Sequence, residues 1–496
     1  MDRSPVIIGV GEVCDRPAHD TNGLTTAEIV VAAIRAAAQD GGVAGALAQV
    51  DSLAIVDALS RDDRSVPLHL EIAAALGIAP RWQRSSPSPS GNFPIRFLND
   101  AADAIAAGAM EMAVIAGGEA MRTFTRTRAG QSANGTQVIR NYRASGEADL
   151  LQRYGILTPI DVYPFYEQAT RHAWGQSFAE AHEESGAIWA GNAQVAAANP
   201  YAWIRDGRPA EAIVTPGPDN PMLAWPYTRS MVANSGVNQG AALLVTSVAR
   251  ARAQGVPDAR MVHVGHGAAA DEAPGNLDRA GFAESPAMVA SLERTLAANG
   301  MQASDLDHVE LYSCFPCVPK MARRVIGWPL DRPHSIYGGL TFGGGPIGNC
   351  MTHAAAALTR RIREGSRNGL IFANGGFATK NHGIVLTRDA MAGGREPRSY
   401  DVQAQADALR GSLPVLLDAH VGEGTIETFT VPFARNEPRH ATILARTPDG
   451  QRFLARVPGS DRAMLAWLTS PQASPVGSPG TAVAGEDGLT RWHRAV

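Results

Sequence analysis

Cysteine is scarce in this chain. Among 496 residues there are four cysteines, at Cys14, Cys314, Cys317 and Cys350. That number is too small for a disulfide framework and fits a reducing, cytoplasmic setting. Cys314 and Cys317 form a C-x-x-C motif, which allows a redox or zinc interpretation. A structural zinc ion needs four ligands, however, and no second pair supplies them, so no metal site is expected.

Positive charge and long apolar runs are missing as well. The chain has 44 Lys and Arg against 48 Asp and Glu, a net charge of −4. It therefore lacks the basic excess that neutralises phosphates, and nucleic-acid binding is not expected. No apolar run reaches the roughly 18–20 residues of a membrane helix, so no membrane span is expected either. The first residues also lack the features of a secretory signal.

Several nucleotide-binding and catalytic motifs are absent. Gly9-Val10-Gly11 lacks the third glycine of a dinucleotide-binding fingerprint. No phosphate-binding loop ends in Gly-Lys-Ser or Gly-Lys-Thr, and no His-Glu-x-x-His or Gly-x-Ser-x-Gly sequence occurs. The sequence thus argues against the commonest dehydrogenases, NTPases, zinc proteases and serine hydrolases.

Strand-like and helix-like segments alternate up to about residue 390, which predicts an α/β fold with covered sheets. They fall into two groups in which strands, helices and glycine-rich turns follow one another in the same order, which is a weak internal repeat. In the first group, strands are expected at 6–10, 50–56 and 112–116, and helices at 26–39 and 97–108. In the second, strands are expected at 241–245, 261–264, 308–312, 370–373 and 383–386, and helices at 286–298 and 352–361.

Two regions do not fit this alternation. Residues 122–225 carry many aromatic and polar residues, and a segment of that length is usually a lid or cap. After about residue 390 the composition changes, with a linker candidate at 393–397. Polar and apolar residues then alternate at 424–431, 440–447 and 451–457, with a hairpin turn at 448–450. A short helix at 461–469 completes what is predicted to be a small antiparallel β-barrel.

Several motifs together resemble the thiolase superfamily. They are Ser88-Pro-Ser-Gly before a helix, the strand ending Ala116-Gly-Gly-Glu-Ala-Met121, Asn238-Gln-Gly-Ala-Ala, Tyr312-Ser-Cys-Phe, the glycine-rich loop from Gly338 to Gly348, and Ala373-Asn-Gly-Gly. They occur in the family's order across residues 4–390, and the tail resembles the OB-fold proteins that accompany many thiolase-like enzymes. The chain thus resembles thiolase-like (acetyl-CoA acetyltransferase-like) proteins with a fused C-terminal OB-type β-barrel.

This resemblance implies a thiolase fold, with duplicated βαβαβαββ halves in α-β-α-β-α layers. The implied domains are an N-terminal half at 1–121 and 226–250, an inserted cap at 122–225, a C-terminal half at 251–392 and the barrel at 393–496. It also implies an acyl-CoA ligand that is substrate rather than cofactor, with no separate cofactor. A homodimer is expected from the fold, although a monomer is possible.

The chain differs from the thiolases that it resembles at the catalytic positions. Where thiolases keep a nucleophilic Cys, a loop His and a second Cys, this chain has Ser88, Gly345 and Ala373. A serine without an adjacent base is a poor nucleophile, and Ser88 could instead cap a helix or line a pocket. The family's second oxyanion hole uses backbone N–H groups, which match Ser88 and Gly375 here and do not depend on the lost side chains.

Three other side chains are candidates for catalysis. Tyr312 could donate a hydrogen bond or act as an acid or base, but it could also be a core residue at a strand end. Cys314 follows two residues later, either as a reactive thiol or as a small buried apolar residue. His382 lies near the lost second Cys and could replace a base, or it could simply pack in the core.

Three functions remain open. The first is an acyl-CoA C-acyltransferase with altered catalytic residues, in which ordinary thiolase activity is doubtful. The second is a retro-aldolase on a 3-hydroxyacyl-CoA, with Tyr312 or His382 as base and the Ser88 and Gly375 amides stabilising the enolate. The third is a non-catalytic acyl-CoA binder. An enzyme is favoured, but the sequence identifies neither the reaction nor the acyl group.

Overall fold

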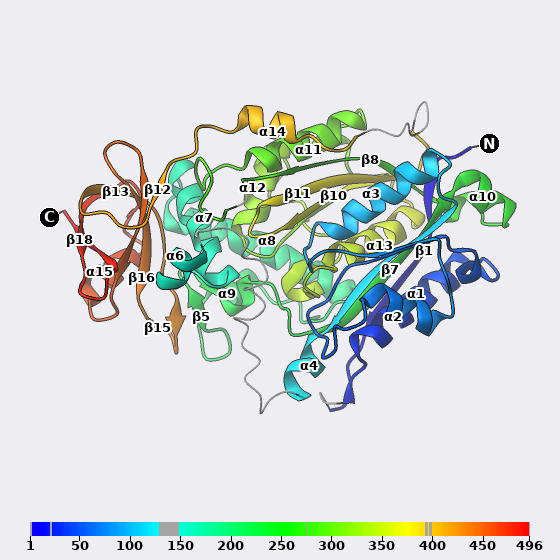
Figure 1. Cartoon of the computed structure of the whole chain (residues 1–496), viewed down its shortest axis with the longest axis horizontal. Coiled ribbons are helices and arrows are strands. Elements are labelled where there is room, and N and C mark those ends of the chain that lie inside the picture. Colours follow the sequence, from blue (N-terminus) through cyan, green and yellow to red (C-terminus); the bar gives the residue numbers. More distant parts are fainter. Residues whose placement is uncertain are drawn as a thin grey trace.

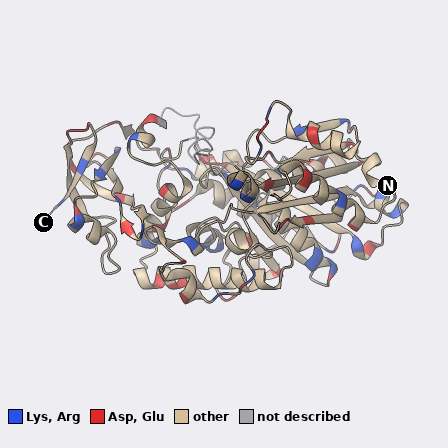
Figure 2. Cartoon of the chain, turned by 90° about the horizontal axis from the view of Figure 1, so that it is seen from below, with Lys and Arg blue, Asp and Glu red and all other residues tan. Residues whose placement is uncertain are grey.

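The structure is a computed structural model, and it describes residues 2–19, 22–127, 148–273, 275–391, 395 and 399–495. Figure 1 shows a large body of helices and strands that contains the N-terminus, and a smaller β-barrel at the opposite end that contains the C-terminus. Charged residues of both signs are scattered over both parts (Figure 2). Within the described residues, no helix combines the length and the apolar character needed to cross a membrane.

The large body is built on one continuous sheet of nine strands in the order β3-β2-β4-β7-β1-β8-β11-β10-β9. These strands are β1 (Pro5–Cys14), β2 (Ser52–Ile55), β3 (Trp82–Ser85), β4 (Met112–Ala120), β7 (Asn238–Ser247), β8 (Val262–Asp271), β9 (His308–Leu311), β10 (Asn368–Gly375) and β11 (Lys380–Thr387). Strands β1 and β8 pair only through Val6 with His263 and Ile7 with Val262. This short pairing joins two half-sheets.

The two half-sheets repeat the same topology. In the first, β1 pairs antiparallel with β7, β7 antiparallel with β4, and β4 parallel with β2. In the second, β8 pairs antiparallel with β11, β11 antiparallel with β10, and β10 parallel with β9. The predicted duplication is therefore confirmed.

Helices form three layers around the half-sheets. Helices α1 (Thr26–Gly41) and α2 (Leu68–Leu76) cover the first half, and α11 (Pro286–Ala298) and α12 (Cys317–Ile326) cover the second. Helices α3 (Phe93–Ala106) and α13 (Cys350–Arg363) contact each other and strands of both halves, so they form the middle layer. Helix α13 contains the buried alanines 354–357, as expected for a helix enclosed on all sides. The helices and half-sheets therefore stack in the order α-β-α-β-α, which confirms the predicted layering.

Helices of the inserted region form the cap between the large body and the barrel (Figure 1). They are α6 (Ala148–Arg153), α7 (Pro159–Ala173), α8 (Phe178–Ala198) and α9 (Ala210–Val214), whereas α4 (Met121–Thr127) lies apart from them at the lower edge of the large body in Figure 1. A capping box of Thr158 and Asp161 begins α7, and one of Ser177 and Glu180 begins α8. The small strands β5 (Met222–Ala224) and β6 (Tyr227–Thr228) lie beside the cap. Helix α10 (Val248–Ala253) lies at the N-terminal end of the large body in Figure 1, and α14 (Gln403–Leu409) packs against α11.

The C-terminal part is a closed barrel in the order β17-β16-β13-β18-β19, closed by pairing of Arg456 with Arg491. Its elements are β12 (Leu416–Leu417), β13 (Gly422–Thr430), β14 (Phe433–Ala434), β15 (Glu437–Pro438), β16 (Ala441–Arg446), β17 (Arg452–Val457), α15 (Arg462–Leu468), β18 (Pro479–Ala484) and β19 (Thr490–Arg494). The predicted turn at 448–450 joins β16 to β17. Of the predicted linker at 393–397, all but Arg395 lies outside the described residues.

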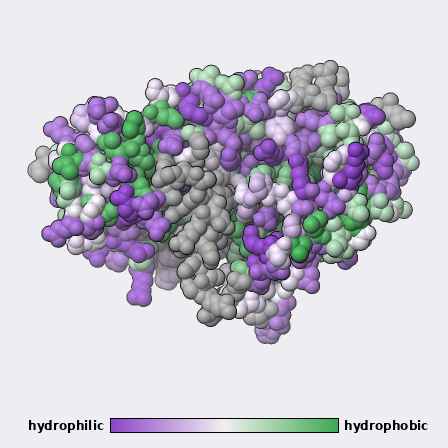
Figure 3. Space-filling view, in the orientation of Figure 1, coloured by the Kyte–Doolittle hydropathy of each residue, from purple (hydrophilic) through white to green (hydrophobic). Residues whose placement is uncertain are grey.

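The barrel packs against the cap through specific hydrogen bonds. The Thr428 hydroxyl donates to the Phe165 carbonyl at 2.6 Å, and the Thr442 hydroxyl donates to the Tyr154 carbonyl at 2.8 Å. Figure 3 shows apolar residues gathered on the barrel side of the surface. Exposed large apolar side chains on the segment leading into the barrel are Leu409, Leu413, Val415 and Val421.

Candidate functional site

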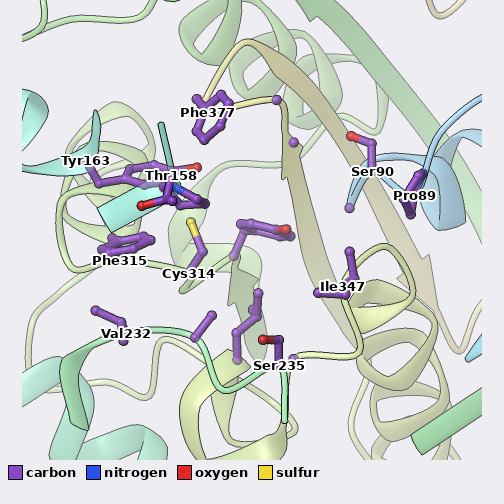
Figure 4. A pocket seen from close by; sticks show the side chains of 18 of the residues that line it. Pro89, Ser90, Thr158, Tyr163, Val232, Ser235, Cys314, Phe315, Ile347 and Phe377 are labelled. Atoms are coloured by element: carbon purple, nitrogen blue, oxygen red, sulfur yellow. The ribbon is translucent and has the colours of Figure 1, made fainter. Parts of the chain in front are cut away.

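A cavity of about 360 Å³ opens where the two halves meet the cap. Its size is in the range of small-molecule sites. It is lined by Leu59, Pro89, Ser90 and Gly91 of the first half, Thr158, Pro159, Ile160 and Tyr163 of the cap, Val232, Ala233 and Ser235 before β7, and Tyr312, Cys314, Phe315, Leu340, Gly345, Ile347, Gly375, Gly376 and Phe377 of the second half. In Figure 4, the rings of Tyr163 and Phe315 lie across the cavity from Pro89 and Ser90.

The structure brings some of the predicted site residues together and separates others. Tyr312, Cys314, Gly345 and Gly375 all contribute to the cavity lining. Ala373 is fully buried within β10. Ser88 and His382 are not among the lining residues. Of the predicted site residues, Tyr312, Cys314 and Gly375 are therefore the ones that can act on a ligand in the cavity through a side chain or a backbone amide.

The turn before α3 explains the position of Ser88. The Ser88 carbonyl accepts hydrogen bonds from the Ser86 hydroxyl at 2.7 Å and from the Ser90 amide at 3.0 Å. This tight turn presents Ser90 and Gly91 to the cavity in place of Ser88. Helix α3 begins at Phe93 with Asn92 at its N-cap position, so Ser88 does not cap the helix.

His382 lies in a separate buried environment. It pairs with Ala373 across β10 and β11, and its ring lies 4.9 Å from that of Tyr400. Burial lowers its pKa to about 3, and the positive charges of Arg96 and Arg395 act in the same direction. Neither ring nitrogen has a hydrogen-bond partner among the described residues. The imidazole is therefore neutral and does not share the cavity with Tyr312.

Tyr312 is held in an unusual position directly after β9. Its backbone φ is 29°, in the left-handed region that non-glycine residues seldom adopt. A β-carbon added to Gly91 would lie 2.3 Å from the Tyr312 hydroxyl oxygen and 2.5 Å from the Asn374 carbonyl. Glycine at position 91 thus allows the phenol to lie against the turn. Strain of this kind is a pointer to function, because the surrounding structure must maintain it.

Cys314 is a neutral thiol in this site. Burial raises its pKa to about 12, although hydrogen bonds from the Tyr163 hydroxyl and from backbone groups act against that rise. The thiolate is the reactive form of cysteine, and it is scarce at neutral pH when the pKa is this high. The Tyr163 ring in turn stacks on Phe315, with 4.3 Å between ring centroids. Cys314 can donate or accept a hydrogen bond, but it is poorly suited to attack a thioester.

Among the residues that the structure describes, none of those lining the cavity is aspartate, glutamate, lysine, arginine or histidine. Its polar groups are hydroxyls, one thiol and backbone amides. A β-carbon on Gly375 would lie 2.0 Å from the Ser90 hydroxyl oxygen and 3.3 Å from the Gly91 amide nitrogen. Gly375 therefore lies directly against the Ser90–Gly91 turn. The site can polarise a bound carbonyl through uncharged donors, but its described lining residues offer no charged base.

The sequence predicts a lid or cap at 122–225 but does not identify which of its residues line the cavity. Ile160 and Tyr163 on α7 form part of the lining, as do Ser235 and Phe377. The Tyr163-Pro-Phe-Tyr166 cluster is conspicuous in the sequence, but nothing local places it at the cavity. Phe377 follows Gly375-Gly376 and has a φ of 60°, so its ring position depends on a turn that the sequence does not specify. Within the described residues, no cluster of His, Cys, Asp and Glu could hold a metal ion.

Comparisons with known proteins agree with this fold. Residues 401–486 match the family described as "Thiolase-like protein type 1 additional C-terminal domain". A monomeric SCP2-thiolase-like protein type 1 from Mycobacterium smegmatis has 28% sequence identity and a TM-score of 0.82, with 100% of both chains covered. No curated protein matches the sequence.

More distant structures share the fold of the large body. An aldolase, Ltp2-ChsH2(DUF35), is 19% identical with a TM-score of 0.60, and human mitochondrial 3-ketoacyl-CoA thiolase in complex with CoA is 12% identical with a TM-score of 0.59. Each alignment covers 78% of this chain and 98% of the other. Together with the duplicated five-layer body and the closed barrel, these matches show a thiolase-like fold followed by an additional C-terminal domain of the type found in thiolase-like proteins.

Proposed function

We propose that the chain binds an acyl-CoA thioester in this cavity, and that any reaction there proceeds without a covalent acyl-enzyme. The observation that carries the proposal is the lining itself. It places Gly375 against the Ser90–Gly91 turn, beside Tyr312, and none of the described lining residues has a charged side chain. Uncharged donors that point at a carbonyl oxygen stabilise the negative charge that develops on it.

The apolar part of the lining suits an acyl chain. Ile160, Val232 and Ile347 surround the polar turn together with aromatic rings. Mostly apolar pockets with a few oriented polar groups are typical of small-molecule sites. The similarity to thiolases, one of them in complex with CoA, supports a CoA thioester as the ligand.

The absence of a covalent step rests on the two candidate nucleophiles in the lining. Cys314 has a pKa raised to about 12 by burial. The Ser90 hydroxyl donates to the Asn92 side-chain oxygen at 2.8 Å, and the lining residues within the described part of the chain include no histidine or carboxylate to accept its proton. A hydroxyl without a base is a weak nucleophile.

The first prediction concerns binding. Calorimetric titration with octanoyl-CoA is expected to give saturable binding well below millimolar ligand, because the apolar lining adds to the affinity for the CoA group. Ser235→Trp places a bulky ring at the exposed rim of the cavity and is expected to weaken binding at least about tenfold. Ser474→Trp, at an exposed position on the barrel, is the matched control and should bind like the wild type.

Intact-mass measurement after incubation with octanoyl-CoA should show no added acyl group. A stable adduct on Cys314 or Ser90 would contradict the non-covalent part of the proposal. A flat titration up to millimolar octanoyl-CoA, acetyl-CoA and free CoA would reject the binding proposal as a whole.

A retro-aldol reaction on a 3-hydroxyacyl-CoA is the second candidate, and the position of Tyr312 favours it. Its hydroxyl lies in the cavity close to Gly91. Tyr312, acting as base, would take the proton from the 3-hydroxyl as the C2–C3 bond breaks, which releases an aldehyde or ketone and leaves the thioester enolate. Tyr312 would then return that proton to C2 of the enolate to give the shorter acyl-CoA. The enolate would be stabilised by the Gly91 and Gly375 region without a covalent intermediate.

For this second candidate, Tyr312→Phe is expected to lower aldehyde or ketone release from a 3-hydroxyacyl-CoA by about 100-fold or more, because proton transfer is lost. Octanoyl-CoA affinity should change only a few-fold. The control is Tyr163→Phe, another phenol in the lining, for which release should stay close to the wild-type rate. If the wild type releases no carbonyl product, the retro-aldol candidate is discarded and the binding proposal stands.

A further inference from the structure

A buried carboxyl group that the proposed function does not use holds one wall of the cavity. Glu119 lies near the end of β4 and is 1% exposed. One of its oxygens accepts from the Leu59 amide at 2.8 Å. The other accepts from the Ser60 amide at 2.9 Å and also from the Ser60 hydroxyl. Leu59 lines the cavity, so this carboxylate fixes a lining residue without touching the cavity itself.

The second half contains a related arrangement around Glu310. This residue is fully buried on β9, and one of its oxygens accepts from the Ser335 hydroxyl at 2.6 Å and from the Ile336 amide at 3.0 Å. The Ser335 hydroxyl oxygen accepts from the amides of Gly338 at 3.0 Å and Gly339 at 2.7 Å, at the start of the glycine-rich loop. Leu340 and Gly345 of that loop line the cavity.

The two carboxyl groups differ in one respect that matters for protonation. Both Glu119 oxygens accept hydrogen bonds, so a proton on either one removes the negative charge and weakens an oxygen that holds a neighbouring amide. The Oε1 atom of Glu310 has no partner among the described residues. Glu310 can therefore carry a proton on Oε1, away from the oxygen that accepts from Ser335 and Ile336. Only in Glu119 does the proton fall on an oxygen that accepts from a backbone amide.

Both groups titrate near neutrality. Burial raises the pKa of Glu119 to about 7 and that of Glu310 to about 8, although the hydrogen bonds that each carboxyl accepts lower its pKa. The titratable groups that face Glu119 are Asp57, which raises its pKa further, and the Cys350 thiol. Burial raises the pKa of Cys350, so this thiol stays neutral in the same range. Asp57 lies within ion-pair distance of Arg61 and Arg64.

We propose that Glu119 is a positioning residue for the cavity, whose ionised carboxylate fixes Leu59 and whose protonation releases it. This inference rests on the proposed function, because the affected property is the affinity for the acyl-CoA. It predicts that acyl-CoA affinity rises with pH from about 6 to about 8, as the Glu119 carboxylate forms. Glu310, whose hydrogen bonds survive protonation, provides the internal comparison.

The test compares Glu119→Gln with Glu310→Gln across pH 5.5–8.5, using octanoyl-CoA as the probe. A glutamine at 119 must turn its NH₂ group toward a backbone N–H, which removes one buried hydrogen bond. Glu119→Gln should therefore bind about tenfold more weakly at pH 8.5 and show little pH dependence beyond that of the ligand. A glutamine at 310 can place its NH₂ group where no partner stands, so Glu310→Gln should follow the wild type.

The pH dependence of stability separates the effect of each carboxyl on folding from its effect on acyl-CoA affinity. The folded-state pKa of each carboxyl lies above its ordinary value of 4.5, so folding favours the protonated form. Stability should therefore fall as pH rises from about 4.5 through about 7 for Glu119 and about 8 for Glu310. Both glutamine variants should lose this part of the pH dependence, whereas only Glu119→Gln should lose affinity.

Two outcomes would overturn the inference. One is a Glu119→Gln variant with wild-type affinity and pH profile, and the other is an equal loss of affinity in both variants. If octanoyl-CoA fails to bind even the wild type, the proposed function fails first. Amide hydrogen exchange then tests the positioning role separately. Protection of the Leu59 and Ser60 amides should decrease at low pH in the wild type and at all pH values in Glu119→Gln.

Discussion

Lys320→Met is expected to lower the free energy of unfolding by about 3–5 kcal/mol, the usual cost of removing one partner from a buried ion pair. The Lys320 ammonium lies 2.5 Å from Glu167, with side-chain exposures of 1% and 4%. The same ammonium donates to the Ala181 carbonyl at 2.8 Å, and the Tyr227 hydroxyl donates to Glu167 at 2.9 Å. Without the lysine, Glu167 is left charged and buried.

The chain provides a matched control for this variant, because it contains only one other lysine. Lys380 lies at the same 2.5 Å from Asp271, but both side chains are nearly half exposed, at 46% and 45%. Lys380→Met should cost less than about 1 kcal/mol, since solvent screens exposed pairs. Chemical denaturation of the full chain measures both variants. Similar costs for the two would show that burial does not govern the strength of the Lys320 pair.

The Lys320 variant should also affect the cavity. Glu167 lies on α7, one turn beyond Tyr163, and Lys320 lies on α12, just after Phe315. The ion pair thus joins α7, which carries the Tyr163 ring, to α12, which begins two residues after Phe315. The double variant Lys320→Met with Glu167→Gln removes both charges and should recover part of the lost stability, because no unpaired buried charge remains.

Gly375→Ala is expected to weaken octanoyl-CoA binding by at least about tenfold and to cost about 1–3 kcal/mol of stability through overpacking. A β-carbon at position 375 would lie 2.0 Å from the Ser90 hydroxyl oxygen, so the Ser90–Gly91 turn or the end of β10 must move. Both segments line the cavity. Calorimetric titration and thermal unfolding measure the two effects.

A second substitution should rescue this variant. With Ser90→Ala, the nearest remaining atoms lie 3.2 and 3.3 Å from the added β-carbon, which small shifts can accommodate. The double variant Ser90→Ala with Gly375→Ala should therefore regain most of the stability and affinity. Gly191→Ala, in α8 with nothing within 4 Å of the added carbon, serves as a neutral control. If the double variant is no better than Gly375→Ala, the contact with Ser90 is not the cause of the loss.

Much of the fold could be predicted from the sequence because it depends on local patterns. Apolar periodicity and glycine-rich turns fix where strands and helices occur, and the order of the motifs fixes how the two halves repeat. The alternating tail with its Pro448–Gly450 turn likewise predicts the barrel. The resemblance to thiolases also predicts, without coordinates, that Ser88, Gly345 and Ala373 replace the side chains of ordinary thiolase chemistry.

Tertiary structure decided which residues share the cavity. Ser88 and Ser90 are two residues apart, and only the hydrogen bonds of the turn determine that Ser90 lines the cavity. His382 lies seven residues after Gly375, yet it is directed into a separate buried site beside Tyr400. Tyr163 reaches the wall from a cap helix far away in sequence. Such placements depend on turns and long-range packing, which local sequence patterns do not encode.

The sequence by itself thus determined the fold, the duplication, the barrel and the loss of the thiolase nucleophile and base. Only the tertiary structure decided that Gly375 lies against the Ser90–Gly91 turn, that Cys314 is a buried neutral thiol, and that Glu119 holds Leu59 at the cavity. The physical reason is that motifs constrain backbone conformation over a few residues. Burial, pKa and the geometry of contacts depend instead on segments that meet only after the chain has folded.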